Sequence, residues 1–146
     1  MDHHRNNGHF HNILVGYDGS QEAEKAVEMG LALAGNLDSR VKVLAVAQPS
    51  EPPTAVELGA VIDDAREHYE KALRRIADAA QQNGIRVETA IAVGHPAEQI
   101  IHQAEQGHVD LIIVGRRGIS TFAKIIMGSV SERVLRYAPC PVLVTR

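Results

Sequence analysis

Apolar and polar residues follow two different periods along this chain, and together they predict five strands and four helices. Segments of strand length that are rich in apolar residues occupy residues 13–17, 41–47, 85–93, 109–114 and 141–145, and the first of them is a continuous apolar run. Such runs are typical of strands that are buried on both faces of a sheet. Between the runs, apolar residues recur every three or four positions, which indicates helices with one buried face.

The predicted helices carry start and stop signals. Ser20 is placed to cap the first helix and Gly35 to stop it, and the long second helix ends at Gly84. Pro96 opens the third helix, because proline is favoured at the first helical position. The fourth helix begins at Ser129. Strands and helices therefore alternate through most of the chain.

This alternation predicts an α/β fold, because parallel strands joined by helices require right-handed crossovers. We expect a doubly wound, Rossmann-like domain with a five-stranded parallel sheet and helices on both faces. In such sheets a ligand binds beyond the carboxyl ends of the strands, where the winding direction reverses. The two loops richest in polar residues and glycine are 18–20, after the first strand, and 115–118, after the fourth. We therefore expect these two strands to be neighbours.

The first twelve residues differ from the rest. Four histidines lie there among Asn, Gly and Arg without periodicity, so we expect residues 1–12 to form a disordered His-rich tail and 13–146 a single domain. Clustered histidines without cysteine or a helical spacing make only a weak and unselective metal site.

Composition excludes several classes of protein. The 146 residues carry 15 basic and 18 acidic side chains, a net charge of −3, with no basic run of the kind that binds a nucleic acid duplex. No apolar stretch approaches the length of a membrane span, and the first residues of the sequence lack the apolar core that a signal peptide has. The single cysteine, Cys140, permits no internal disulfide, and we expect it to be a small buried residue. These features favour a cytoplasmic protein with neither nucleic acid nor membrane as partner.

The segment from Gly115 to Ser129 has the pattern of a glycine-rich phosphate site. Gly115, Gly118 and Gly128 lack side chains that would block the approach of phosphate to backbone N–H groups. Ser129 adds a hydroxyl at the start of a helix, where free N–H groups and the helix dipole favour an anion. The charged residues between the first glycine and this serine are all basic: Arg116, Arg117 and Lys124. The segment therefore predicts a phosphate site.

Two residues of these loops also have structural interpretations. Ser129 and Glu132 match a capping box, which explains the serine but not the glycines. Asp18 is a candidate ligand for a cation or a sugar hydroxyl, although an Asp after a strand commonly caps the next helix. Ser20 can supply that cap alone, so we favour the ligand role for Asp18. For His95 we expect an N-cap or loop position and no catalytic role.

These motifs resemble the universal stress protein family from Ile13 to Arg146. The resemblance lies in the loop 18–20, in Gly94-His95-Pro96-Ala97, in residues 110–115, in 128–134 and in the ending 138–144. The glycine set together with Ser129 is similar to that of the members that bind ATP.

The resemblance implies that Asp18 lies by the ribose and triphosphate and that the backbone around Val46 meets the adenine. It further implies that residues 115–118 and 129–131 hold the phosphates, usually with Mg or Mn, and Asp18 is then also the candidate metal ligand. The candidate nucleotide-binding residues are Gly16, Asp18, Val46, Gly115, Arg116, Arg117, Gly118, Gly128, Ser129, Val130 and Ser131.

The predicted function is that of an ATP-binding regulatory or sensor protein of the stress response. No residue pattern supplies a base or a Walker-type lysine, so we expect slow ATP hydrolysis at most. Three alternatives stay open: an adenylating or hydrolysing enzyme of the wider fold group, a receiver-like or flavodoxin-like module, and a dimerising adaptor with an empty pocket. The resemblance also implies a homodimer that pairs through the last strand, 141–145.

Overall fold

The computed structural model describes residues 10–49, 54–116 and 129–146. The strands are β1 (Asn12–Tyr17), β2 (Arg40–Ala47), β3 (Arg86–Val93), β4 (Leu111–Gly115) and β5 (Val142–Thr145). The helices are α1 (Gln21–Leu37), α2 (Ala55–Gln82), α3 (Pro96–Gln106) and α4 (Ser129–Tyr137). All of these elements were expected from the sequence, in this order.

The five strands form one parallel sheet in the order β3-β2-β1-β4-β5. β1 lies at its centre, where Val15 pairs with Val43 of β2 on one side and with Ile113 of β4 on the other. The predicted α/β fold is therefore confirmed, and so is the expectation that the first and fourth strands are neighbours. β3 and β5 form the two edges of the sheet.

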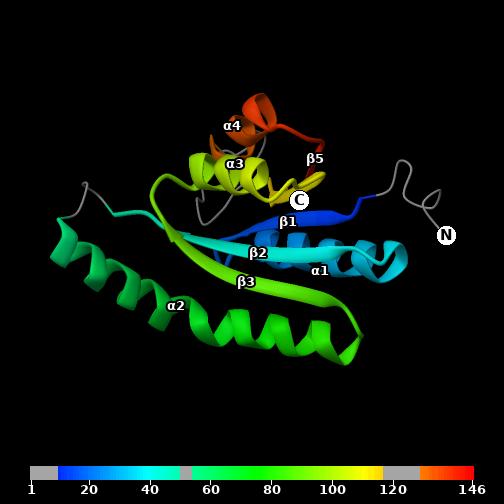
Figure 1. Ribbon diagram of the computed structural model, residues 1–146, viewed down its shortest axis with the longest axis horizontal. Helices are drawn as coiled ribbons and strands as arrows, with labels where there is room; N and C mark the ends of the chain where they lie inside the picture. The colour runs from blue at the N-terminus through cyan, green and yellow to red at the C-terminus, as the bar shows by residue number, and fades with distance from the viewer. Residues whose placement is uncertain (1–9, 50–53, 117–128) are drawn as a thin grey trace.

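The helices cover the sheet in two layers, α1 and α2 on one face and α3 and α4 on the other (Figure 1). Along β1 the side chains alternate between the layers. Val15 is fully buried against α1 and α2, and Leu14 is fully buried against α3 and α4. Cys140 is half-buried beside the second layer, and burial raises the pKa of its thiol. The apolar runs in the sequence thus reflect strands that are covered on both sides.

α3 packs closely on the sheet at Gly16. A β-carbon built on this glycine would lie 2.9 Å from Ile100 Cδ1 and 3.3 Å from Val114 Cγ1. Contacts this short require a neighbour to move, so a residue with a side chain fits poorly here. Gly16 is a candidate nucleotide-binding residue, but the close packing of α3 on the sheet also favours a glycine at this position.

Two helix ends differ from the sequence prediction. Gly35 does not stop α1, which continues to Leu37 and ends where Asp38 adopts a left-handed conformation with φ 57°. The N–H of Asp38 then bonds the carbonyl of Ala34, which closes the helix as a glycine would. α2 begins earlier than its apolar stripe because Thr54 and Glu57 form a complete capping box.

The end of the predicted tail is ordered, which corrects its boundary. The Asp110 carboxylate accepts hydrogen bonds from the backbone N–H of His11, at 2.8 and 3.0 Å, and of Asn12, at 3.0 Å. Phe10 packs against the core, and Asn12 already belongs to β1. Because Asp110 makes these bonds before the strand begins, the fourth strand starts at Leu111 and not at residue 109 as predicted. Residues 1–9 lie outside the described part of the chain.

None of the helices within the described ranges has the length and apolar character that crossing a bilayer requires.

Candidate functional site

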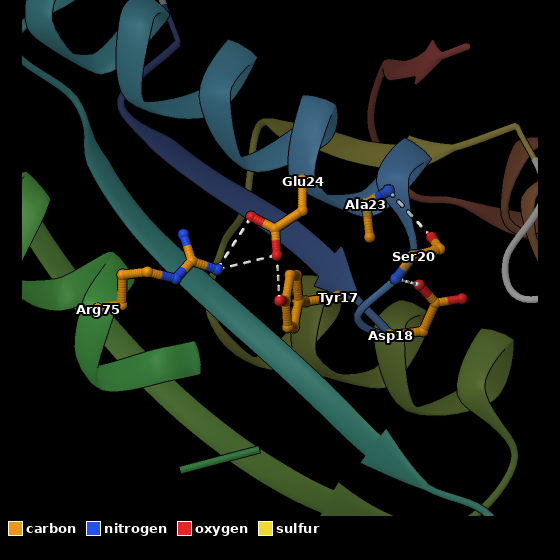
Figure 2. A network of polar contacts seen from close by, with 6 residues as sticks. All are labelled: Tyr17, Asp18, Ser20, Ala23, Glu24 and Arg75. Carbon is orange, nitrogen blue, oxygen red and sulfur yellow. Dashed lines mark hydrogen bonds and ion pairs between the residues drawn. The ribbon is translucent and has the colours of Figure 1, made fainter. Parts of the chain in front are cut away.

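The loop after β1 places Asp18 at the carboxyl end of the central strand. Oδ1 of Asp18 accepts a hydrogen bond from the N–H of Ser20 at 2.9 Å, and Ser20 Oγ accepts one from the N–H of Ala23 at 3.1 Å (Figure 2). Ser20 is therefore the N-cap of α1, as predicted, and Asp18 holds the turn that leads to it. Among the described residues, no hydrogen bond reaches the second carboxylate oxygen of Asp18. That oxygen remains available to a ligand.

Tyr17 anchors the same loop to the helices beneath it. Its hydroxyl donates a hydrogen bond to Glu24 of α1, and Arg75 of α2 donates to the same carboxylate at 2.9 and 3.1 Å (Figure 2). Burial and the Glu24 carboxylate raise the pKa of Tyr17 to about 12, so the phenol stays protonated and continues to donate at neutral pH. The tyrosine is therefore part of the core beneath α1 and α2.

α2 brings a second tyrosine towards the loop. The ring of Tyr69 meets that of Tyr17 edge-on, with centroids 6.3 Å apart. Burial raises the pKa of Tyr69, and the negative charge of Asp18 adds to this effect. The Asp18 carboxylate therefore contributes to the raised pKa of Tyr69 in α2, and it also accepts the hydrogen bond that holds its own turn.

The carboxyl end of β4 lies against the first turn of α1. A β-carbon at Gly115 would lie 2.7 Å from Glu22 Cβ and 2.9 Å from the Glu22 carbonyl carbon. Both atoms are fixed close to the helix backbone, so neither can move away easily. The glycine that we assigned to phosphate binding is thus also required by the packing of α1 on β4.

The backbone of Arg116 is engaged on both sides. Its N–H donates to the carbonyl of Thr145 at 2.6 Å, and its carbonyl accepts from Ser131 Oγ at 2.8 Å. Ser131 is almost fully buried and ties the start of α4 to the loop after β4. The Arg116 N–H is therefore committed to β5 in this structure. The other candidates of this loop, Arg117 and Gly118, lie outside the described residues, as does Gly128.

The first turn of α4 presents one exposed hydroxyl. Ser129 is the first residue of the helix and is exposed, whereas Val130 packs against the core on the α3 and α4 side. Within the described chain Ser129 and Glu132 form no hydrogen bond, so the alternative capping box is absent there. The hydroxyl at the mouth of this helix remains available for an anion.

β2 extends beyond its neighbour at the same end of the sheet. The last residue pair between β1 and β2 is Tyr17 with Ala45, whereas Val46 and Ala47 pair only with β3. The carbonyl of Ala47 accepts a hydrogen bond from the N–H of Gly94 at 2.9 Å, so the backbone of Ala47 faces β3. Val46 is the residue of β2 that extends past the end of β1 on the side of β1. This extension was not foreseen, because only the strand register reveals it.

A divalent cation at this site would need ligands from outside the protein. The described residues contain no group of three His, Cys, Asp or Glu side chains placed to hold a metal ion. Asp18 offers a carboxylate oxygen at the carboxyl edge, and Mg²⁺ is commonly bound through one or two carboxylates together with substrate phosphates. The residues present fit a cation carried by a phosphorylated ligand.

Known proteins share both the sequence and the fold. The sequence profile of the universal stress protein family matches residues 9–146. Universal stress protein YxiE of Bacillus subtilis is 33% identical over 94% of this chain and 99% of its own length. The structure of universal stress protein UspA from Lactobacillus plantarum has a TM-score of 0.85 at 27% identity and covers 96% of this chain and 100% of its own.

One of the similar solved structures contains cAMP. A universal stress protein in complex with cAMP has a TM-score of 0.73 at 27% identity, over 94% of this chain and 97% of its own.

Proposed function

Because this chain belongs to the universal stress protein family, we propose that it binds ATP, together with Mg or Mn, and acts as a regulatory or sensor protein of the stress response. The site we propose lies at the carboxyl ends of β1, β2 and β4. The cAMP complex of a similar protein supports an adenine nucleotide as the ligand class.

The observation that carries this proposal is the reversal of winding between β1 and β4. The helix after β1, α1, covers one face of the sheet, and the helix after β4, α4, covers the opposite face. In doubly wound sheets a ligand binds beyond the carboxyl ends of the strands where the winding reverses in this way. Asp18 follows β1, and Arg116 follows β4. The two strands thus bring an acidic and a basic residue to one edge of the sheet.

Each part of ATP has a counterpart at this edge. The adenine lies against the backbone of Val46, and the second oxygen of Asp18 accepts from the ribose or binds the cation. The triphosphate extends towards the exposed hydroxyl of Ser129 at the N-terminus of α4, where the helix dipole favours an anion. Arg117, Gly118 and Gly128 complete the phosphate site on the sequence pattern.

A regulatory role suits this set of residues better than rapid catalysis. Phosphoryl transfer requires a group that positions the nucleophile and cations that stabilise the developing charge. The carboxylate that follows β1, Asp18, already holds the turn into α1. We therefore propose that the bound nucleotide is sensed and at most slowly hydrolysed.

Replacing Asp18 with alanine should weaken ATP binding about 5- to 150-fold, which corresponds to about 1–3 kcal/mol. The variant loses a charge-assisted contact to the ribose or the cation. Isothermal titration with Mg·ATP measures the affinity, and thermal unfolding without ligand measures the stability. Asp63→Ala, on the exposed face of α2, is the matched control and should leave both unchanged.

A purely structural Asp18 would give the opposite pattern. The stability of the ligand-free protein would then fall, since the hydrogen bond to Ser20 is lost, while the affinity of the folded protein for ATP would hold. That result would contradict the ligand role.

We also propose that the protein is a homodimer that pairs through β5. This strand lies at an edge of the sheet, and an edge exposes unpaired backbone groups that proteins normally cover. Val142 and Val144 pack towards one face and Leu143 towards the other. Pairing about a two-fold axis would cover the edge with an identical copy.

Wild-type protein should sediment as a dimer at micromolar concentration, and Leu143→Pro should sediment as a monomer or lose stability, because proline removes a backbone donor. Sedimentation equilibrium measures the mass of each. A wild-type protein that stays monomeric at high concentration rules this interface out, whatever the behaviour of the variant.

A further inference from the structure

A closed ring of hydrogen bonds surrounds the turn that carries Asp18. The N–H of Ser20 donates to Asp18 Oδ1 at 2.9 Å, and the carbonyl of Ser20 accepts from the N–H of Glu24 at 3.0 Å. The Glu24 carboxylate in turn accepts from the hydroxyl of Tyr17, which is joined to Asp18 by a peptide bond. The turn is therefore fixed both before and after Asp18, and Figure 2 shows the second oxygen of Asp18 pointing away from the ring.

Glu24 joins this ring to the second helix of the same layer. Its carboxylate accepts from the hydroxyl at the end of β1 and also from Arg75 of α2, at 2.9 and 3.1 Å (Figure 2). Its backbone N–H closes the first turn of α1 on Ser20. Three elements, β1, α1 and α2, therefore meet at one residue beside the turn of Asp18.

These contacts are better suited to fixing a position than to stabilising the fold. Tyr17 is only 4% exposed and packs in the core, a role that phenylalanine would fill as well. The side chains of Arg75 and Glu24 are 59% and 33% exposed, so their ion pair adds little to stability. Burial and the Glu24 carboxylate raise the pKa of Tyr17 to about 12, and the hydrogen bonds to Glu24 raise the pKa of Arg75. Both groups therefore remain donors at neutral pH.

We propose that Tyr17 is a positioning residue of the nucleotide site, and that its hydroxyl, held by Glu24, keeps the second oxygen of Asp18 turned towards the ligand. The inference rests on the proposed function, in which that oxygen accepts from the ribose or binds the cation. A carboxylate that is held in one orientation before the ligand arrives loses less conformational freedom on binding, so the fixed turn increases affinity. Tyr17 acts through Asp18, because its own ring is buried and its hydroxyl is already bonded to Glu24.

Replacing Tyr17 with phenylalanine removes the hydroxyl and keeps the ring in the core. Glu24 retains its bonds to Arg75, so the melting temperature of the ligand-free protein should fall by at most about 5 °C. The affinity for Mg·ATP should fall about tenfold, the low end of the loss that follows when a partner orienting a metal-binding side chain is removed. Tyr137→Phe, on the exposed end of α4, is the matched control and should change neither quantity.

A double-mutant cycle with Asp18→Ala shows whether Tyr17 acts through Asp18. Without the Asp18 carboxylate there is nothing left to orient, so Tyr17→Phe should cause no further loss of affinity in the Asp18→Ala protein. Isothermal titration with Mg·ATP measures all four proteins. A merely structural tyrosine would lower the melting temperature and leave the affinity unchanged. That result, or an equal loss of affinity with and without the Asp18 carboxylate, would overturn the role of Tyr17 and leave the proposed function intact.

Arg75 provides a second test should Tyr17→Phe fail to fold. Arg75→Met removes the donors of α2 from Glu24 and should weaken Mg·ATP binding about threefold, whereas Arg75→Lys should restore most of the affinity. Arg74→Met is the matched control, because it removes an exposed ion pair with Glu70 from the same helix. Equal affinities of Arg75→Met and Arg74→Met would overturn the inference. Absence of saturable ATP binding by the wild type would instead refute the proposed function, and the inference with it.

Discussion

Gly115→Ala is expected to lower the melting temperature by about 6–12 °C, although it adds only one methyl group. The new β-carbon would lie 2.7 Å from Glu22 Cβ and 2.9 Å from the Glu22 carbonyl carbon. Overpacking of this kind costs about 1–3 kcal/mol, and we expect the upper end because the obstacle includes helix backbone. To relieve the clash, α1 must move away from β4, which also displaces the Asp18 loop that precedes the helix.

The matched control is Gly59→Ala in α2. A β-carbon at Gly59 has no heavy atom of another element within 4 Å, so alanine there should be neutral or stabilise the helix by up to about 1 kcal/mol. Differential scanning calorimetry of the two variants compares them directly. Equal melting temperatures would show that α1 and β4 are not packed as closely as described.

Gly118→Val and Gly128→Val are expected to abolish ATP binding and leave the stability of the ligand-free protein unchanged. Both glycines lie outside the described residues, and the expectation rests on the spacing of the sequence motif. A branched side chain there would block phosphate from the backbone N–H groups. Titration calorimetry with Mg·ATP measures the loss, and thermal unfolding verifies the fold.

Gly59→Val serves as the control for a branched residue at a position far from the site. Unchanged ATP affinity in both Gly118→Val and Gly128→Val would refute the phosphate assignment. Together with Gly115→Ala, the series separates two reasons for glycine in one motif: close packing at the end of β4, and access of a ligand to the loop.

The fold was predictable because its signals are local. Apolar runs marked each strand, and Ser20 and Pro96 marked helix starts that the structure confirms. The predicted positions of helix ends were less accurate where the signal in the sequence is weak or comes from a distant residue. Gly35 was expected to stop α1, yet the helix continues to Asp38, whose left-handed conformation replaces that of a glycine.

For the candidate site, the sequence predicted which strand ends lie side by side and not the detailed contacts there. The sequence placed Asp18 and Gly115 at one edge, and the strand order agrees. Contacts between residues far apart in the chain were out of reach. The proximity of Gly115 to Glu22 and the commitment of the Arg116 N–H to Thr145 follow from the packing of α1 and β5 on β4. The extension of β2 at Val46 past the end of β1 depends on register, which no local pattern encodes.

The most direct test of the central claim is a titration of isotopically labelled protein with Mg·ATP, followed through its backbone amide resonances. The account predicts saturable shifts at the carboxyl edge, at Gly19, Ala47 and Ser129. It predicts no change at Arg40 and Arg86, which begin β2 and β3 at the opposite edge of the sheet. Saturable shifts confined to that opposite edge, or no saturable shifts at all, would contradict it.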